Sequence, residues 1–335
     1  MYKPIELAHF AFAEFERDLA GLTDDEARVR TLKADGTRMN AISWIVAHVA
    51  GHWLARPEHL EQFNFRSSDP TPPSLAQARA WFEEGREFTE RWLPNANDEL
   101  LTRVLQNNVE GETIGTGMMR ATLHTWFHNG EINAIRQMLG HHEIFFLGDI
   151  TQHLEWHVGG NVEDGFRPRE LARFAFSEFE RGLEGISDEE ARTRVEKSDG
   201  TKMNAITWTI KHISVPWLFG YTLAADRPMP SGMRDYFGAD ADPTPPPLAD
   251  ALALFADARA SMEAWLPRAD EDLLSSKRDF GPLPDENIGT QLMRAVLHTW
   301  FHIGEINATR QLLGHAEIPY VGVLLGNLEW RGGAS

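Results

Sequence analysis

Two histidines one helical turn apart are the clearest candidates for chemistry in this sequence. His124 and His128 lie in LHTWFHNGEINAIRQMLGH, residues 123–141. Residues four apart on a helix share one face, about 6 Å apart along the axis, so both imidazoles can bind one metal ion. A useful site needs a third ligand, and His48 is the candidate. Three neutral imidazoles leave the ion doubly positive and coordinatively open, which lowers the pKa of a bound water or thiol toward neutrality.

The same trio recurs further along the chain. LHTWFHIGEINATRQLLGH, at 297–315, carries His298 and His302, and KMNAITWTIKH, at 202–212, ends in His212. All four histidines of the second copy match a histidine of the first, whereas six of the ten in the first copy have no counterpart. Histidine pairs arise by chance on helices, but the presence of the whole trio in both copies favours metal binding. Three imidazoles suit Zn, Ni, Fe, Co or Mn, so we expect one divalent metal ion per domain, its identity open.

One acidic residue follows each pair of histidines on the same helix face. Glu131 lies seven residues after His124, and Glu305 is its counterpart. These glutamates are candidate catalytic residues, either as acceptors for a ligand N–H or as proton acceptors near the metal. The structural alternative is a helix cap or an inter-helix partner for Arg136 or Arg120. The residues between the two histidines are Thr-Trp-Phe, which excludes a gluzincin-type protease with its HExxH motif.

Other matched residues have simpler interpretations. His141 and His315 follow a glycine at the end of each motif, too far along the helix to bind the same ion, and we expect them to cap it. Trp44 and Trp208 lie one turn before the upstream histidine and either line a pocket or fill the core. An Arg-Gln pair, expected at an interface or on the surface, occurs at 136–137 and at 310–311.

These motifs belong to a duplicated unit. ELAHFAFAEFERDLAGLTDDEAR at 6–28 recurs as ELARFAFSEFERGLEGISDEEAR at 170–192. Early segments are offset by 164 positions (212 − 48) and late ones by 174 (298 − 124), so the second copy is longer by about ten residues. Units of this length exceed solenoid repeats. The sequence therefore predicts two domains, 1–160 and 166–335, with 158–168 as the linker.

Each copy is expected to form four helices. In the first copy, the apolar spacing, N-caps and stop signals place them at about 4–21, 38–60, 74–92 and 115–139. Alternating β-type runs are few. The predicted fold class is all-α, two tandem four-helix bundles with a long connection between the second and third helices of each.

Composition narrows the range of partners. Lys and Arg total 32 against 50 Asp and Glu, a net charge of −18, which disfavours nucleic acid and anionic membranes. The absence of cysteine excludes disulfides, thiolate metal sites and a cysteine nucleophile. The first twenty residues predict an amphipathic helix rather than a signal peptide, and no run of 18 apolar residues occurs. We therefore expect a cytoplasmic protein.

The pattern of motifs resembles the DinB/YfiT-like metalloenzyme superfamily. It consists of a lone histidine late in the second helix, HxxxH in the fourth helix, Gly-Glu after it, and a closing Leu-Gly-His. The resemblance covers both halves. It implies an up-down-down-up four-helix bundle in each, with three histidines binding a divalent metal. Some members are S-transferases or isomerases that use low-molecular-weight thiols such as bacillithiol or mycothiol. Members often pair as homodimers, so two fused copies resemble an internal pseudo-dimer.

Two classes of function follow. The first is a metal-dependent transferase or hydrolase, in which a thiol or water at the metal attacks a small molecule. The second is a non-catalytic metal-binding helical module with a structural or interaction role. A structural site is usually closed by four protein ligands, and the sequence supplies no obvious fourth ligand, which favours the enzyme.

Overall fold

The computed structural model describes residues 2–54, 71–105, 111–141, 150–157, 165–224, 244–277, 286–316, 321–322, 324 and 326–332. Across these residues the chain is α-helical, with isolated β-bridges and no strand, which confirms the predicted all-α fold class. None of the described helices is long and apolar enough to cross a membrane.

Four long helices occur in each half of the chain. The first half contains α1 (Pro4–Asp18), α3 (Ile42–Leu54), α5 (Leu75–Trp92) and α7 (Ile114–Met138). The second contains α8 (Pro168–Gly182), α10 (Ile206–Ala224), α11 (Leu248–Trp265) and α13 (Ile288–Leu312). Short helices join them: α2 (Asp24–Ala27), η1 (Leu93–Asn95), α6 (Asp98–Leu101), η2 (Ile150–Gln152), α9 (Asp188–Arg192), η4 (Leu266–Arg268) and α12 (Glu271–Ser275).

The helix that carries the lone histidine begins later than the sequence predicts. The expected helix 38–60 starts at Ile42 instead of residue 38. The preceding chain folds back on itself through a bridge between Leu32 and Arg38, which holds it extended. The predicted end, 55–60, lies outside the described residues.

Local sequence signals explain several helix starts. Thr23 and Glu26 form a reciprocal capping box at the start of α2, and Ser187 and Glu190 form the same box at α9. Each box satisfies two main-chain N–H groups that the helix leaves without partners. Thr113 caps α7 by accepting a hydrogen bond from the main chain of the third helical residue. The matched boxes start α2 and α9 in the same way in the two halves.

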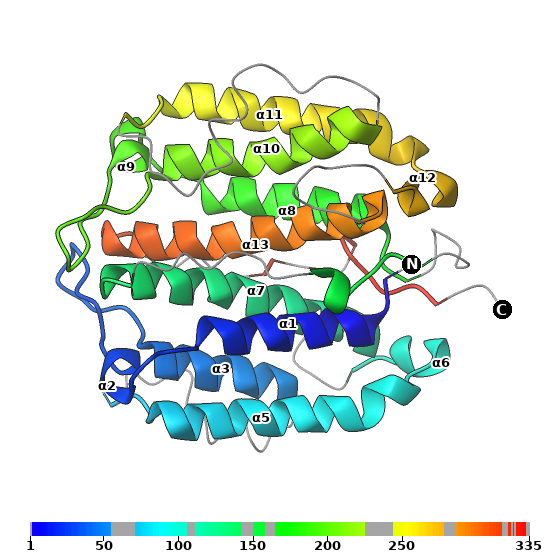
Figure 1. Cartoon of the computed structure of the whole chain (residues 1–335), viewed down its shortest axis with the longest axis horizontal. Helices are drawn as coiled ribbons and strands as arrows, with labels where there is room; N and C mark the ends of the chain where they lie inside the picture. The colour runs from blue at the N-terminus through cyan, green and yellow to red at the C-terminus, as the bar shows by residue number, and fades with distance from the viewer. Residues whose placement is uncertain are drawn as a thin grey trace.

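The two helices that carry the histidine pairs, α7 and α13, lie side by side at the centre of the molecule (Figure 1). Helices α1, α3 and α5 lie on one side of this pair, and α8, α10 and α11 lie on the other (Figure 1). Nearly all residues of α7 and α13 are buried, as expected for helices packed on every side. At their crossing, a Cβ on Gly130 would overlap the carbonyl oxygen of Phe301, and one on Gly304 would overlap that of Phe127. Only glycine permits so close an approach of the two backbones.

Segments that follow the long helices reach into the opposite half. The main-chain N–H of Trp156 donates to Oγ1 of Thr290 at 2.9 Å, and that of Trp330 donates to Oγ1 of Thr116 at 2.9 Å. Each tryptophan therefore covers the first turn of the other half's central helix, where Gly289 and Gly115 leave room for the indole.

The loops before α3 and α10 make a second reciprocal contact, at the opposite ends of the central helices. Ala34 N–H donates to the carbonyl of Leu312 at 3.0 Å, and Ser198 N–H donates to that of Met138 at 3.1 Å. These bonds satisfy carbonyls that a helix C-terminus leaves without intrahelical partners. Both ends of α7 and α13 are thus held by the other half.

Candidate metal centres

His48 of α3 meets His124 and His128 of α7 in the interior of the first half. Nε2 of His124 lies 3.2 Å from Nε2 of His48 and 2.7 Å from Nε2 of His128. The three ligand nitrogens lie within 4.8 Å of one another. The residues are only 5%, 1% and 1% exposed, so little water competes for these nitrogens. The structure thus brings together the trio singled out in the first copy of the sequence.

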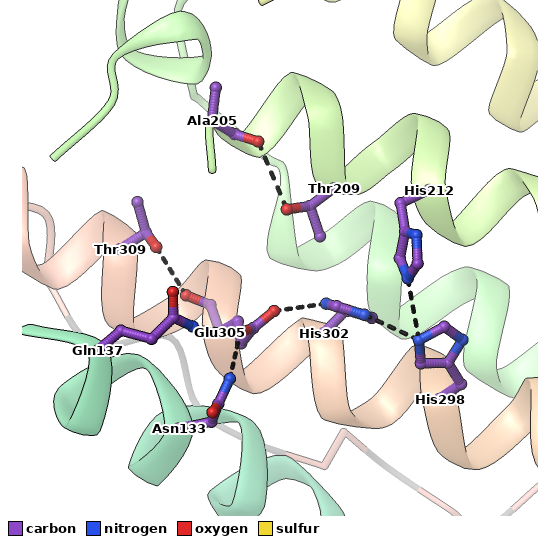
Figure 2. Close-up of polar contacts among 9 residues, drawn as sticks. All are labelled: Asn133, Gln137, Ala205, Thr209, His212, His298, His302, Glu305 and Thr309. Atoms are coloured by element: carbon purple, nitrogen blue, oxygen red, sulfur yellow. Dashed lines mark hydrogen bonds and ion pairs between the residues drawn. The ribbon is translucent and has the colours of Figure 1, made fainter. Parts of the chain in front are cut away.

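The second half repeats this arrangement. Nε2 of His298 lies 3.2 Å from Nε2 of His212 and 2.9 Å from Nε2 of His302 (Figure 2). The side chain of His302 is 9% exposed against 2% for His128, so the second centre is slightly more open to solvent.

Hydrogen bonds beside the histidines fix the register of the helices that carry them. Trp53 of α3 donates its indole N–H to Oγ1 of Thr125 at 2.9 Å. Trp217 of α10 makes the same bond to Thr299, at 3.0 Å. Each threonine immediately follows the first histidine of the pair, and each tryptophan lies five residues after the lone histidine. Sliding of one helix along the other would break this buried bond, which is costly.

Several of the histidine rings are held in the neutral form, which can bind a cation. Burial lowers the pKa values of His48, His124 and His298 well below the usual histidine range, and the neighbouring histidines lower them further. These rings are therefore neutral near pH 7, the form of imidazole that binds metals. Two nitrogens bound to one ion at about 2.0–2.1 Å lie about 3 Å apart. The observed separations match this value, so the donor set fits a divalent ion.

The glutamates that follow each pair contact the second histidine of that pair. Nδ1 of His128 lies 2.8 Å from Oε2 of Glu131, and Nδ1 of His302 lies 2.5 Å from Oε2 of Glu305. Because a carboxylate can only accept, Nδ1 carries the proton and Nε2 presents its lone pair to the other two rings. This is the arrangement in which an outer carboxylate orients a metal-binding imidazole.

The two arginines considered as partners for these glutamates have other contacts. Arg120 donates Nε–H to Oε1 of the buried Glu112 at 2.7 Å. Arg136 donates to the main-chain oxygen of Asp18, at the end of α1.

In each centre a tryptophan ring stacks on the ring of the lone histidine. Trp44 stacks on His48 with ring centroids 5.1 Å apart and an interplanar angle of 9°. Trp208 stacks on His212 at 4.9 Å and 10°. Trp208 is a buried core residue and Trp44 packs partly buried against the core, as predicted for a core role, and both also contact the histidine ring.

His52 lies beside the first centre and was not among the residues predicted from the sequence. Its ring centroid lies 4.1 Å from that of His124 and 5.0 Å from that of His48. Burial, aided by the nearby charges of His128 and Arg120, lowers the pKa of His52 to about 3. The position that corresponds to His52 in the second copy is Pro216. Because the two copies do not share a histidine there, matching the copies could not identify His52. The signal that could have found it is its spacing, four residues after His48.

The histidines at the helix ends lie apart from both centres. The main-chain N–H of His141 donates to Arg136 O at 3.2 Å, and that of Gly140, whose φ is +92°, donates to Gln137 O at 3.0 Å. This is a Schellman ending in which glycine takes the left-handed conformation. The His141 side chain pairs with Glu26 at 3.3 Å. His315 completes the same ending on α13.

Residues 172–306 match the family model of the DinB superfamily. This DinB-like stretch contains His212, His298 and His302, so the match supports the predicted resemblance where the second centre lies. It does not extend into the first half. No curated protein and no solved structure matches the chain.

Proposed function

We propose that the protein is a divalent-metal-dependent enzyme that acts on a small molecule, with a three-histidine centre in each half. The observation that carries this proposal is the convergence of three Nε2 atoms in each half. In both halves a glutamate accepts the hydrogen bond of the second ring's Nδ1. Such a donor set, repeated in two halves that differ elsewhere in sequence, is expected for a metal site.

A divalent ion held by three histidines supplies a Lewis acid and lowers the pKa of a water or thiol that takes the remaining position. The chain's own residues hold and shield the ion. Glu131 and Glu305 keep their histidines in the tautomer that presents Nε2, so we assign them positioning roles. The stacked Trp44 and Trp208 fix the planes of the lone histidines and exclude water from one side of each centre.

The number of protein ligands favours an enzyme over a non-catalytic metal-binding module. Among the described residues, each centre gathers three metal-binding side chains rather than the four of a closed structural site. A fourth position is therefore left for an exchangeable molecule. With the DinB-like match at 172–306, this supports thiol-dependent transfer or hydrolysis as the reaction class.

We further propose that the chain consists of two DinB-like bundles, 1–160 and 166–335, arranged as an internal pseudo-dimer. The reciprocal contacts support this organisation. The crossing at Gly130 and Gly304, the two exchanged tryptophans and the two exchanged loops each occur once in either direction.

Metal analysis of single-centre variants tests the proposal. The purified chain is expected to bind two equivalents of Zn²⁺, and His128→Ala and His302→Ala are each expected to bind one. A screen of low-molecular-weight thiols against a chlorinated nitroaromatic electrophile, with and without a chelator, then tests the reaction class. Loss of both equivalents in either variant would contradict independent centres, and a wild-type chain without metal would overturn the proposal.

A further inference from the structure

The glutamate of the first centre is held by a residue from the second half of the chain. Gln311 of α13 donates its Nε2–H to Oε1 of Glu131 at 3.2 Å. The other oxygen of Glu131 accepts from Nδ1 of His128. The carboxylate of Glu131 therefore lies between a histidine of its own half and an amide of the opposite half.

The second centre has the reciprocal arrangement, in which two amides of the first half contact the glutamate. Asn133 of α7 donates Nδ2–H to Oε1 of Glu305 at 2.7 Å, and Gln137 donates Nε2–H to the same oxygen at 3.2 Å. Oε2 of Glu305 accepts from His302 (Figure 2). The chain of contacts from first-half amide to glutamate to second-half histidine is visible across the helix pair (Figure 2).

The close crossing of α7 and α13 makes these contacts possible. Gly130 and Gly304 allow the two backbones to meet one residue before each glutamate. Asparagine and glutamine side chains can then reach the glutamate carboxylate on the facing helix. Helices at ordinary separations of about 8–10 Å would leave a wider gap to span.

Burial makes these amide contacts consequential. Glu131 is 1% exposed and Gln311 is 3% exposed, so water offers little replacement for the hydrogen bond between them. A buried carboxylate oxygen that loses its hydrogen bond is costly, and the carboxylate relieves that cost by rotating toward other donors. This rotation weakens its hold on Nδ1 of His128.

We propose that each metal centre is completed by the other half of the chain, with Gln311 positioning Glu131 and His128, and with Asn133 and Gln137 positioning Glu305 and His302. These amides contact the glutamates and act through them, so their role is positioning. The inference rests on the proposed function for its effect on metal affinity. It makes a separate prediction for the metal-free chain, because the positioned glutamate fixes the histidine tautomer whether or not a metal ion is bound.

The decisive experiment places Gln311→Met in chains that keep a single centre. His298→Ala with His302→Ala keeps the first centre, and His124→Ala with His128→Ala keeps the second. In the first-centre chain, Gln311→Met is expected to weaken Zn²⁺ binding about tenfold, the lower end of the effect of outer partners of metal-binding histidines. In the second-centre chain, Zn²⁺ affinity is expected to be unchanged. Competition with a chromogenic chelator measures both.

The matched control removes both amides that reach Glu305, by Asn133→Leu together with Gln137→Met, and the opposite pattern is expected. Methionine nearly preserves the volume of glutamine and leaves no unpaired polar group of its own, so the fold is expected to persist. Thermal unfolding of each variant checks this. If either variant weakens only the centre in its own half, or neither centre, the inference is wrong and metal binding itself is unaffected.

Two further measurements separate positioning from a general structural effect. If Gln311 acts through Glu131, then adding Gln311→Met to Glu131→Gln produces no additional loss of Zn²⁺ affinity, whereas independent effects add. Histidine ¹⁵N spectra of the metal-free chain are expected to show the Nδ1–H tautomer at His128 in the wild type and a tautomer mixture in Gln311→Met. An unchanged tautomer would overturn the inference, even for a chain that bound no metal.

Discussion

Gly130 of α7 lies directly against the main-chain carbonyl of Phe301 in α13, with no room for a side chain between them. The same contact occurs in reverse between Gly304 and Phe127. This crossing brings each metal-centre glutamate within reach of the other half's amides. The spacing of two backbones therefore sets the geometry of both centres.

Gly130→Ala is expected to destabilise the protein and to weaken both centres. A Cβ at this position overlaps backbone atoms that belong to a rigid helix, so the helices must separate. Overpacking of a tight core typically costs about 1–3 kcal/mol, and a backbone obstacle belongs at the upper end. Urea unfolding measures the loss, and chelator competition measures the accompanying fall in Zn²⁺ affinity.

Gly182→Ala is the matched control. Gly182 is also helical, but a Cβ there meets only Cγ2 of Ile303, at an ordinary 3.9 Å. Replacing a helical glycine with alanine is expected to be neutral or to stabilise by about 0.5–1 kcal/mol. Equal stability losses in the two variants would show that the close crossing has no special importance.

The sequence was sufficient for those features that depend on helical periodicity. His124 and His128 share a face because they are four residues apart, and the duplication identified His48 as the third member by its match to His212. Capping residues and proline positions likewise placed most long helices near their observed bounds.

The contacts between halves could not be predicted from periodicity. The Arg-Gln pair at 310–311 was expected at an interface or on the surface, but its two members face different partners. Arg310 donates to Gly182 O within its own half at 2.7 Å, whereas Gln311 crosses to Glu131. Neighbouring residues on a helix point about 100° apart, and only the packing of α7 on α13 decides which of them meets the other half.

His52→Phe is expected to leave the metal content of the first centre unchanged. The ring of His52 lies edge-on to that of His124, yet the converging trio is completed by His48 and His128. Phenylalanine preserves a flat ring at the site and removes both nitrogens. Metal analysis in the chain that carries His298→Ala and His302→Ala isolates this centre. Loss of metal from that variant would show that His52 is a fourth ligand and that the centre is closed.

Asp18, the last residue of α1, is a buried acid without a counterpart in the second half. It is 1% exposed, and neither carboxylate oxygen has a hydrogen-bond partner among the described residues. The matching residue in α8 is Gly182. Burial raises the pKa of Asp18 well above the usual range, although Arg136 and Arg17 oppose the shift. Its ionised form therefore destabilises the folded protein.

Asp18→Asn is expected to stabilise the protein increasingly as the pH rises. The pKa in the unfolded chain is about 3.9, and the folded value is higher, so the unfolded chain ionises first. Stability that is fully present below about pH 3.9 is then lost as the pH rises through the folded-state pKa. The difference between variant and wild type should be small near pH 4 and reach a plateau above the folded-state pKa. Urea unfolding from pH 4 to pH 8 measures it.

Asp35→Asn provides the opposite case for comparison. Hydrogen bonds from the side chain and main chain of Thr37 lower the pKa of this exposed carboxyl, so its contribution to stability appears above the unfolded pKa. Removal of the Asp35 carboxylate should slightly lower the stability of the folded protein at neutral pH, whereas removal of the Asp18 carboxylate should raise it. If Asp18→Asn gave no gain at pH 8, the Asp18 carboxylate would have to be ionised and stabilised by Arg136. The first half would then hold a buried ion pair at the position where the second half has glycine.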